Sequence, residues 1–333
     1  MGPAHQKCRD QTRLNEMDHT KDQAVKVDPA SIAQSVEPPA IAGPVDHPRR
    51  PSWKPPAGAC DSHAHLFGPT DRFPYTEGRG YTPPEAPLER YLGLLDHLGL
   101  DRGVIVQGNS HGYDNRVVLD AVEREPQRLR GVCITDNRVG PAELKRWDAS
   151  GIRGLRFHLF AKSNQPGYLR GVGWDVLQSF LPTMRDLGWV VQLWIDWQLL
   201  PDIVDDIALL GRQAPVVIDH VLSLPASRGV ADPSFQSLLK LVGDGLVYAK
   251  LSAQNRQSDD RDRYDDVRPM HQQLVAANPE RLLWGSDWPH TSSPADLMPD
   301  DGALVDLLER WVPSPAIRET ILVHTPQRLF WNH

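Results

Sequence analysis

The sequence has few cysteines, no long apolar run and no secretion signal. Cys8, Cys60 and Cys133 lie far apart and form no CxxC pair, which argues against a disulfide framework and favours a reducing compartment. The first residues lack the apolar core of a signal peptide. No stretch approaches the run of about 18 apolar residues that a membrane-spanning helix needs. These absences predict a cytoplasmic protein.

An excess of basic residues is also missing. The formal net charge is −7, whereas proteins that bind nucleic acids or membrane surfaces usually present a basic face. We therefore expect no nucleic acid and no membrane as partner. A small anionic ligand is still compatible with the charge, because a pocket can be basic inside an acidic protein. The sequence carries no signal for the oligomeric state.

Residues 1–57 differ from the rest of the chain. They contain nine prolines and show no sustained helical or strand period. Such a segment buries too little apolar surface to offset the entropy lost on ordering. The composition predicts a mobile, proline-rich N-terminal tail over 1–57 and a folded domain over 58–333.

From residue 59 onward, short apolar runs alternate with amphipathic segments. The alternation predicts eight strands, at 59–66, 103–107, 129–135, 152–159, 189–195, 216–221, 246–251 and 281–286. Helices are expected between and after them, at 87–98, 114–125, 141–147, 174–187, 201–212, 234–242, 267–277, 302–311 and 315–323. Strands that are apolar on both faces and alternate with helices are typical of parallel βαβ units.

Two parallel architectures fit this alternation: a closed barrel and an open doubly wound sheet. The open sheet usually has a glycine-rich phosphate loop after its first strand, and residues 59–67 contain none. The sequence therefore predicts an α/β fold, an eight-stranded (β/α)8 barrel of the TIM type.

Polar residues with catalytic potential occur where the predicted strands end. The first strand ends in Asp-Ser-His63-Ala-His65, the sixth in Asp-His220, and the eighth in Gly-Ser-Asp287. Each has a structural alternative: a chance HxH, a buried core histidine, or an aspartate that caps a turn. Together they indicate one site, because the C-terminal strand ends of a barrel meet at a single rim.

Seven short segments resemble the amidohydrolase-related lactonase family. They are CDSHAHLFGP at 60–69, RFPY at 72–75, YTPP at 81–84, VIVQ at 104–107, GIRGLRF at 151–157, LWGSDWPH at 283–290 and TPQRLF at 325–330. The resemblance covers residues 59–333. It implies an amidohydrolase-type barrel and a carboxylic-ester hydrolase that opens a small anionic lactone in the breakdown of aromatic compounds. 4-Sulfomuconolactone, with release of sulfite, is the first expected substrate, and 2-pyrone-4,6-dicarboxylate is the second.

The same resemblance implies roles for particular residues. Asp287 would transfer protons, and His63, His65 and His220 would bind metal or polarise the scissile carbonyl. Arg156 after the fourth strand and Arg256 beyond the seventh would hold substrate carboxylates, since a guanidinium matches a carboxylate with two parallel hydrogen bonds. Further substrate contacts are expected from Tyr81 on a loop and from His290, and less directly from His158 and Lys162.

Two features depart from the metal-dependent members of the superfamily. The fifth predicted strand offers no histidine, and the fourth has no lysine at its end. A two-metal site is therefore not expected. The prediction is one divalent metal, Zn²⁺ in the first place, held by His63, His65 and Asp287 with help from His220. A metal-free mode remains open. The alternative functions are a metal-dependent decarboxylase of an aromatic or related carboxylic acid and a barrel that only binds a ligand.

Overall fold

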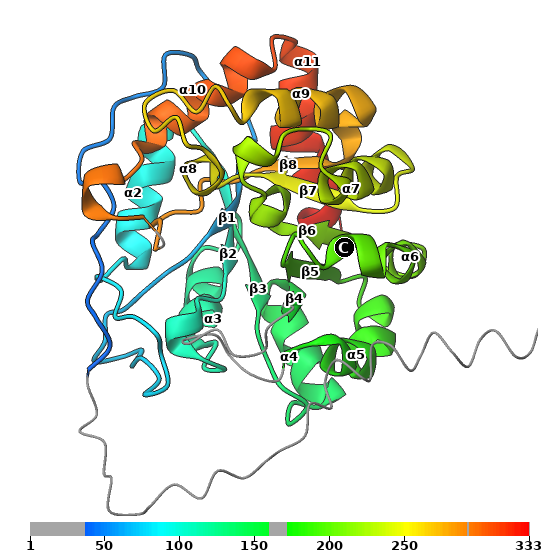
Figure 1. The fold of residues 1–333 in the computed structure, drawn as a ribbon. Helices are drawn as coiled ribbons and strands as arrows, with labels where there is room; N and C mark the ends of the chain where they lie inside the picture. Colours follow the sequence, from blue (N-terminus) through cyan, green and yellow to red (C-terminus); the bar gives the residue numbers. More distant parts are fainter. Residues whose placement is uncertain (1–36, 160–171, 292, 333) are drawn as a thin grey trace, which may run out of the picture. The chain divides into compact units, whose positions relative to one another are not determined.

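The computed structural model describes residues 37–159, 172–291 and 293–332. From Pro39 onward the chain forms one compact unit, built around eight parallel strands that pair in chain order (Figure 1). The strands are β1 (Cys60–Ala64), β2 (Arg102–Val106), β3 (Leu129–Cys133), β4 (Ile152–Leu159), β5 (Val190–Ile195), β6 (Val216–Ile218), β7 (Tyr248–Leu251) and β8 (Leu282–Trp284). All eight predicted strands are therefore confirmed: β4 has the predicted bounds, β2 is shifted by one residue, and the other six are shorter than predicted.

The sheet closes between its last and first strands. The backbone N–H of Asp287 donates to the carbonyl oxygen of His63 at 2.9 Å, and that of His65 donates to Trp288 at 2.7 Å. Ala64 and Trp288 form a parallel bridge. These bonds join the segment after β8 to β1, which confirms the barrel and brings the segments of His63 and Asp287 side by side.

Helices follow the strands and cover the outside of the sheet (Figure 1). They are α2 (Leu88–Leu98), α3 (Arg116–Arg124), α4 (Pro141–Ser150), α5 (Trp174–Asp186), α6 (Leu200–Gly211), α7 (Pro233–Gly243), α8 (Gln254–Gln257), α9 (Arg268–Ala277), α10 (Asp301–Trp311) and α11 (Pro315–Glu319). Only the one-turn α8 was not predicted. Within the described residues, no helix combines the length and apolar character of a membrane span.

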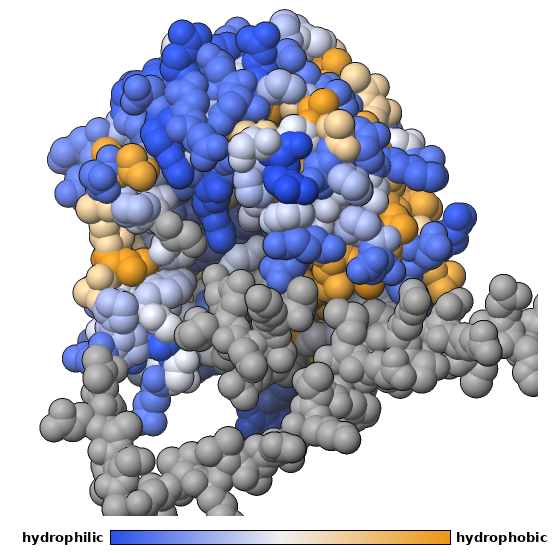
Figure 2. All heavy atoms as spheres, in the orientation of Figure 1, coloured by the Kyte–Doolittle hydropathy of each residue, from blue (hydrophilic) through white to orange (hydrophobic). Residues whose placement is uncertain are grey.

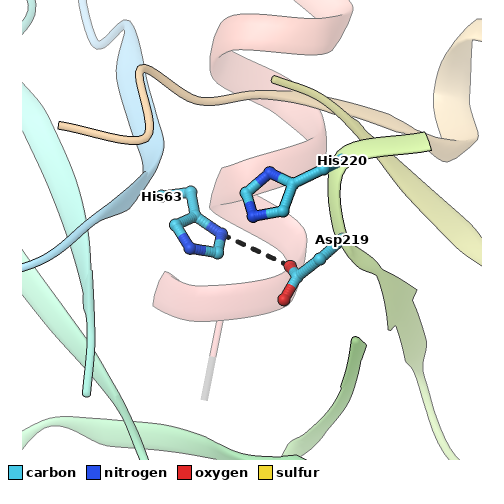
Figure 3. A group of neighbouring side chains, drawn as sticks. All are labelled: His63, Asp219 and His220. Atoms are coloured by element: carbon cyan, nitrogen blue, oxygen red, sulfur yellow. Dashed lines mark ion pairs between the residues drawn. The ribbon is translucent and has the colours of Figure 1, made fainter. Parts of the chain in front are cut away.

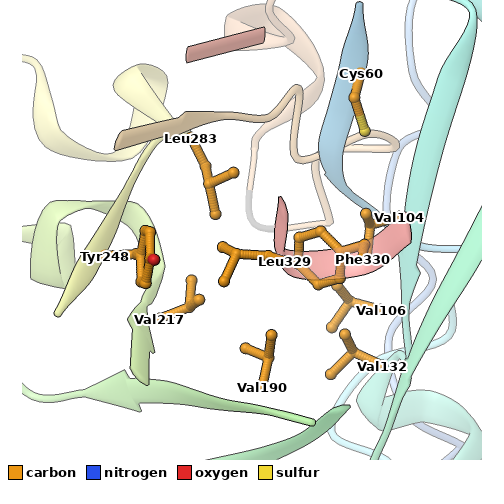
Figure 4. Close-up of a cluster of buried hydrophobic side chains, with 10 residues drawn as sticks. All are labelled: Cys60, Val104, Val106, Val132, Val190, Val217, Tyr248, Leu283, Leu329 and Phe330. Atoms are coloured by element: carbon orange, nitrogen blue, oxygen red, sulfur yellow. The ribbon is translucent and has the colours of Figure 1, made fainter. Parts of the chain in front are cut away.

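Apolar side chains fill the N-terminal end of the barrel (Figure 4). Leu329 and Phe330, from the last helical turn (Gln327–Trp331), pack against buried residues of seven of the eight strands. The facing residues are Cys60, Val104, Val106, Val132, Val190, Val217, Tyr248 and Leu283. The C-terminal segment therefore plugs the end of the barrel opposite the site.

On the visible outer face, hydrophilic residues cover most of the coloured surface and apolar residues form small patches (Figure 2).

A polar layer lies above this apolar layer, two residues further along several strands. Gln192 lies two residues after Val190, Asp219 two after Val217 and Lys250 two after Tyr248. All three polar side chains are fully buried. Residues two apart on a strand share a face, so each pair projects into the barrel. Barrel interiors usually contain branched apolar residues, which makes a polar layer evidence for function.

Residues 39–57 do not behave as the predicted tail. Trp53 donates its indole N–H to the carbonyl of Val305 at 3.2 Å, and the guanidinium of Arg318 lies 4.8 Å from its ring centre. Arg49 forms an ion pair with Asp306 at 2.5 Å. The boundary at residue 57 is therefore wrong, because a segment without a period of its own is ordered here by tertiary contacts. Residues 1–36 lie outside the described part, so their tail character stays a prediction.

Candidate active site

Four of the predicted site residues meet at the C-terminal rim of the barrel. His63 and His65 come from the end of β1, His220 from the turn after β6 and Asp287 from the turn after β8. His220 and Asp287 have positive φ angles of 53° and 64°. Residues other than glycine rarely adopt this backbone conformation, and such strained positions cluster at functional sites. The turns therefore hold these two residues where an ordinary strand end could not.

The ring nitrogens of the three histidines face one carboxylate oxygen. Oδ1 of Asp287 lies 3.7 Å from Nε2 of His63, 3.6 Å from Nε2 of His65 and 3.6 Å from Nε2 of His220. The Nε2 atoms of His63 and His65 are 3.3 Å apart. The donor atoms of His63, His65 and Asp287 thus lie close enough together to share one ion, and His220 approaches the same carboxylate oxygen.

This arrangement fits a single divalent metal ion. A tetrahedral ion with ligand bonds of about 2.0–2.1 Å keeps its ligand atoms roughly 3.3–3.4 Å apart, close to the separations above. Nδ1 of His65 lies 2.8 Å from the carbonyl oxygen of Val106, the kind of outer contact that orients a metal-binding histidine. Nε2 of His220 is buried and has no hydrogen-bond partner among the described residues. The donors present suit a metal such as Zn²⁺.

A buried ionic network lies next to His63. Asp219 accepts hydrogen bonds from Nε of Arg156 at 2.9 Å and from Nε2 of Gln192 at 2.9 Å. Its Oδ1 also lies 3.4 Å from Nζ of Lys250 and 3.3 Å from Nδ1 of His63, the contact drawn in Figure 3. Buried charges are tolerated when they are paired and hydrogen-bonded. Asp219 thus joins β4, β5, β6 and β7 to the histidine of β1.

Burial and charge set the protonation states of these groups. Burial and the positive charge of Lys250 hold the pKa of His63 well below its usual value. Burial also lowers the pKa of His220 to about 4 and that of Lys250 to about 8. For Asp219, burial raises the pKa, but Lys250, Arg156 and His63 outweigh it and hold the pKa well below the usual range. His63 and His220 are therefore neutral near pH 7, as metal ligands must be.

The carboxylate of Asp287 is ionised in this setting. Burial alone would raise its pKa, but His220, His65, His63 and Arg256 outweigh burial and hold the pKa well below the usual range. An ionised carboxylate can bind a cation or accept a proton from water.

Arg256 connects the metal-binding cluster to an open cavity. Its Nη1 lies 3.7 Å from Oδ2 of Asp287, and its guanidinium carbon lies 5.2 Å from the ring centre of Trp194. Together with Asn255, Arg261, Ser293, Pro294 and Leu297 it lines a cavity of about 370 Å³. A guanidinium between a cavity and the reactive carboxylate is well placed for an anionic ligand.

Arg156 is a buried residue inside β4, and its Nε donates to Asp219 at 2.9 Å. The predicted strand 152–159 already contained it, so its expected place after the fourth strand is wrong. Its guanidinium carbon is 4.9 Å from the ring centre of Trp194. The strand continues past Arg156 because β4 pairs with β5 as far as Leu159. Contact with a substrate stays a prediction for this residue.

The other predicted substrate-binding residues are dispersed. Tyr81 is half-buried in the loop before α2, and its carbonyl oxygen accepts from Ser110 at 3.4 Å. His290 is buried with Nε2 3.0 Å from Asp301, which outweighs the effect of burial and raises its pKa. His158 lies in β4, and its ring centre is 5.5 Å from that of Trp194. Lys162 lies outside the described residues.

Sequence reasoning missed the supporting roles of Asp61, Asp219 and Lys250. The carboxylate of Asp61 accepts from the hydroxyl of Ser286 at 2.6 Å and from Tyr91 at 3.1 Å, and burial raises its pKa to about 6. It thus ties β8 and α2 to β1. The detectable signal was a charged residue inside an apolar strand, most clearly Lys250 between Ala249 and Leu251.

Comparison with known proteins agrees with this geometry. The amidohydrolase family model matches residues 60–331. The chain belongs to the amidohydrolase family. Two curated members of similar sequence are the 4-sulfomuconolactone hydrolase of Rhizobium radiobacter, 41% identical over 83% of this chain and 90% of the relative, and the 2-pyrone-4,6-dicarboxylate hydrolase of Comamonas testosteroni, 34% identical over 86% and 94%.

A solved structure of a protein from Agrobacterium tumefaciens superposes with a TM-score of 0.73. It is 29% identical and covers 84% of this chain and 98% of its own. The family and the barrel predicted from the sequence are thereby confirmed. Both curated relatives are named as hydrolases of lactones or pyrones, which matches the lactonase group that the sequence motifs indicated.

Proposed function

We propose that this amidohydrolase opens the ring of a small anionic lactone formed in the breakdown of aromatic compounds. The observation that carries the proposal is the convergence of three histidine nitrogens on Oδ1 of Asp287, with Arg256 on the side of Oδ2. Oδ1 of this carboxylate faces the three histidines, where the reaction would take place. Oδ2 lies beside the positive charge of Arg256, which lines the cavity.

In the proposed reaction Asp287 moves the proton. As a carboxylate it accepts a proton from the attacking water, whose oxygen adds to the lactone carbonyl carbon. The bond from that carbon to the ring oxygen then breaks, and Asp287 returns the proton to the leaving oxygen. His220 faces the same point with a buried Nε2 and helps to polarise the scissile carbonyl. The products are a carboxylate and an opened chain.

We further propose that His63, His65 and Asp287 hold one divalent metal, most suitably Zn²⁺, with His220 as an additional ligand. A bound metal of this kind supplies electrostatic stabilisation for the negative charge that develops on the carbonyl oxygen. The support for it is the spacing of the donor atoms of His63, His65 and Asp287, which lie 3.3, 3.6 and 3.7 Å apart, close to the separations around a tetrahedral ion. Asp219, 3.3 Å from Nδ1 of His63, helps to hold that ring in place.

The positive groups at the rim favour an anionic substrate. Arg256 and Arg261 both line the cavity beside Asp287, although the chain as a whole has a net charge of −7. Tyr81, Arg156 and His290 remain proposed contacts for the substrate. We propose 4-sulfomuconolactone as the first substrate, with ring opening followed by loss of sulfite, and 2-pyrone-4,6-dicarboxylate as the second. The similarity to hydrolases of both compounds supports this order.

The test is a rate comparison over the two proposed substrates and a neutral lactone of similar size, each with and without a chelator. We expect rapid turnover of an anionic lactone, with one sulfite released per 4-sulfomuconolactone consumed. The neutral lactone should be a poor substrate. Equal turnover of the neutral and anionic lactones would refute the proposed specificity. Full activity in a chelated, metal-free preparation would refute the metal requirement while leaving the lactonase assignment intact.

The alternative of a decarboxylase is less well supported. The predicted absence of a histidine from the fifth strand holds for β5, where the inward residue Gln192 binds Asp219. Release of CO₂ from an aromatic carboxylate, without hydrolysis of any lactone in the same screen, would favour that alternative.

A further inference from the structure

Lys250 is fully buried on β7, and the proposed hydrolysis does not use it. Its Nζ lies 3.0 Å from Nδ1 of His63 and 3.4 Å from Oδ1 of Asp219. We propose that Lys250 is a positioning residue that holds His63, in the metal-free protein, with its proton on Nε2, and that it thereby weakens metal binding. The inference rests on the metal site of the proposed function.

The hydrogen-bond directions start from His65. Its Nδ1 is 2.8 Å from the carbonyl oxygen of Val106. A carbonyl oxygen can only accept, so Nδ1 of His65 carries the proton. In a neutral imidazole the other nitrogen is then an acceptor. Nε2 of His65 therefore presents a lone pair to the site.

This lone pair determines the state of His63. The Nε2 atoms of the two rings are 3.3 Å apart, and only His63 can supply the proton between them. Nδ1 of His63 then has a lone pair, and it faces the ammonium of Lys250, which has only protons to donate. In this arrangement Lys250 donates to Nδ1 of His63, and Nε2 of His63 donates to Nε2 of His65. Nδ1 of His65 in turn donates to the carbonyl oxygen of Val106.

The opposite tautomer of His63 creates two conflicts. A proton on Nδ1 could bind Oδ1 of Asp219 at 3.3 Å, but it would also face the ammonium of Lys250 at 3.0 Å. The two Nε2 lone pairs would face each other at 3.3 Å. A metal ion between these nitrogens would remove the second conflict only.

A cost to metal binding follows. A metal ligand needs the lone pair of Nε2, so ligation by His63 requires its proton to move to Nδ1 and Lys250 to give up its hydrogen bond. Oδ1 of Asp219, 3.3 Å from Nδ1 of His63, can accept a hydrogen bond from the relocated proton. Lys250 therefore opposes the tautomer that binds metal, whereas Asp219 supports it.

The tautomer can be read in the unmodified full-length protein without any activity measurement. We suggest ¹⁵N NMR of histidine-labelled, chelator-treated protein at pH 7, with the His63 signals assigned by their loss in His63→Gln. The expected result is a neutral His63 protonated at Nε2. In Lys250→Met the tautomer with the proton on Nδ1, facing Asp219, should become more populated, because only the contact between the two Nε2 atoms still opposes it. A wild-type His63 protonated at Nδ1 would overturn the proposal without the need for any variant.

Metal affinity gives a second readout, with Co²⁺ as the spectroscopic probe. Lys250→Met should bind Co²⁺ at least tenfold more tightly than the parent. Because loss of a positive charge alone favours a cation, Arg256→Met is the control: it removes a charge near Asp287, and none of its hydrogen bonds in the described residues involves a histidine. Equal gains in the two variants, with no change in the His63 tautomer, would contradict the proposal. Failure of the lactone screen would leave both readouts valid.

Discussion

At the scale of single residues, Asp287 is the most informative position. Its Oδ1 faces three histidines and its Oδ2 lies 3.7 Å from Arg256. The carboxylate can therefore bind at the histidine cluster through Oδ1 and exchange protons with water or substrate through Oδ2. The positive φ of 64° at this residue shows that the turn after β8 is shaped to present it.

Asp287→Asn should lower kcat at least 100-fold, since general base catalysis contributes roughly 10²- to 10⁴-fold and an amide cannot accept the proton. The volume is nearly unchanged, so the melting temperature should stay close to that of the parent. Because Asp287 is also a proposed ligand, metal content must be measured beside the rate. A folded variant with full metal content and a rate within tenfold of the parent would refute the assignment.

Arg256 and Arg156 should respond differently to replacement by Met. Loss of a charge-assisted hydrogen bond to a substrate anion should raise KM for an anionic lactone roughly 10- to 100-fold in Arg256→Met, with an unchanged melting temperature. Arg156→Met removes a buried partner of Asp219, which costs roughly 3–5 kcal/mol and should lower the melting temperature. Identical stability of the two variants would contradict the structural role given to Arg156.

At the scale of secondary structure, the junction of β8 with β1 determines the geometry of the site. Asp61 accepts the backbone N–H groups of His63 at 3.1 Å and Ser286 at 2.9 Å. Gly285 lies between Ser286 and the end of β8, where a Cβ atom would approach Cβ of His63 to 2.7 Å. A side chain at this position would push His63 away from Asp287.

Gly285→Ala should therefore reduce both stability and activity. Overpacking costs about 1–3 kcal/mol, so we expect the melting temperature to fall by several degrees and kcat/KM to drop with it. Gly93→Ala is the matched control, because a Cβ there meets nothing within 4 Å. An active Gly285→Ala protein with parental stability would show that the two strands tolerate a wider separation.

The helix α9 contributes a pH-dependent term to stability. His271 is buried against Trp311, with ring centres 5.1 Å apart, and burial lowers its pKa from 6.5 to about 3. The unfolded chain therefore binds a proton that the folded chain refuses, and stability is lost as the pH falls from about 6.5 toward 3.

His271→Leu removes this titration. The variant should lose less stability than the parent between pH 7 and pH 4, by on the order of 3 kcal/mol, as measured by melting temperature across that range. His324→Leu is the control, since the side chain of His324 is 64% exposed. Parallel pH profiles for His271→Leu and the parent would mean that His271 becomes protonated without unfolding.

At the scale of the whole domain, the segment 39–57 belongs to the barrel. Ser52 donates its backbone N–H to Asp306 at 2.7 Å, and His97 contacts the carbonyl of Pro48 at 2.8 Å. These contacts connect the segment to α10 and α2. They are long-range contacts, between 49 and 254 residues apart in sequence.

Two truncations separate this segment from the predicted tail. A chain starting at residue 37 should keep the parental melting temperature, because residues 1–36 are predicted to make no stable contacts. A chain starting at residue 58 should melt at a lower temperature, because it loses the packing of Trp53 on Arg318. Equal stability of the two truncations would restore the original boundary at residue 57.

The sequence alone determined the order of strands and helices, the closure into a barrel and the strand ends at which four candidate site residues meet. These features follow from local periodicity and from the rule that strand ends share one rim. Only the tertiary structure decided the buried network of Asp219 with Arg156 and Lys250. Ion pairs between residues 63 positions apart, such as Arg156 with Asp219, leave no periodic trace. The ordering of residues 39–57 was also decided by distant partners, because the segment has too few apolar residues to order itself.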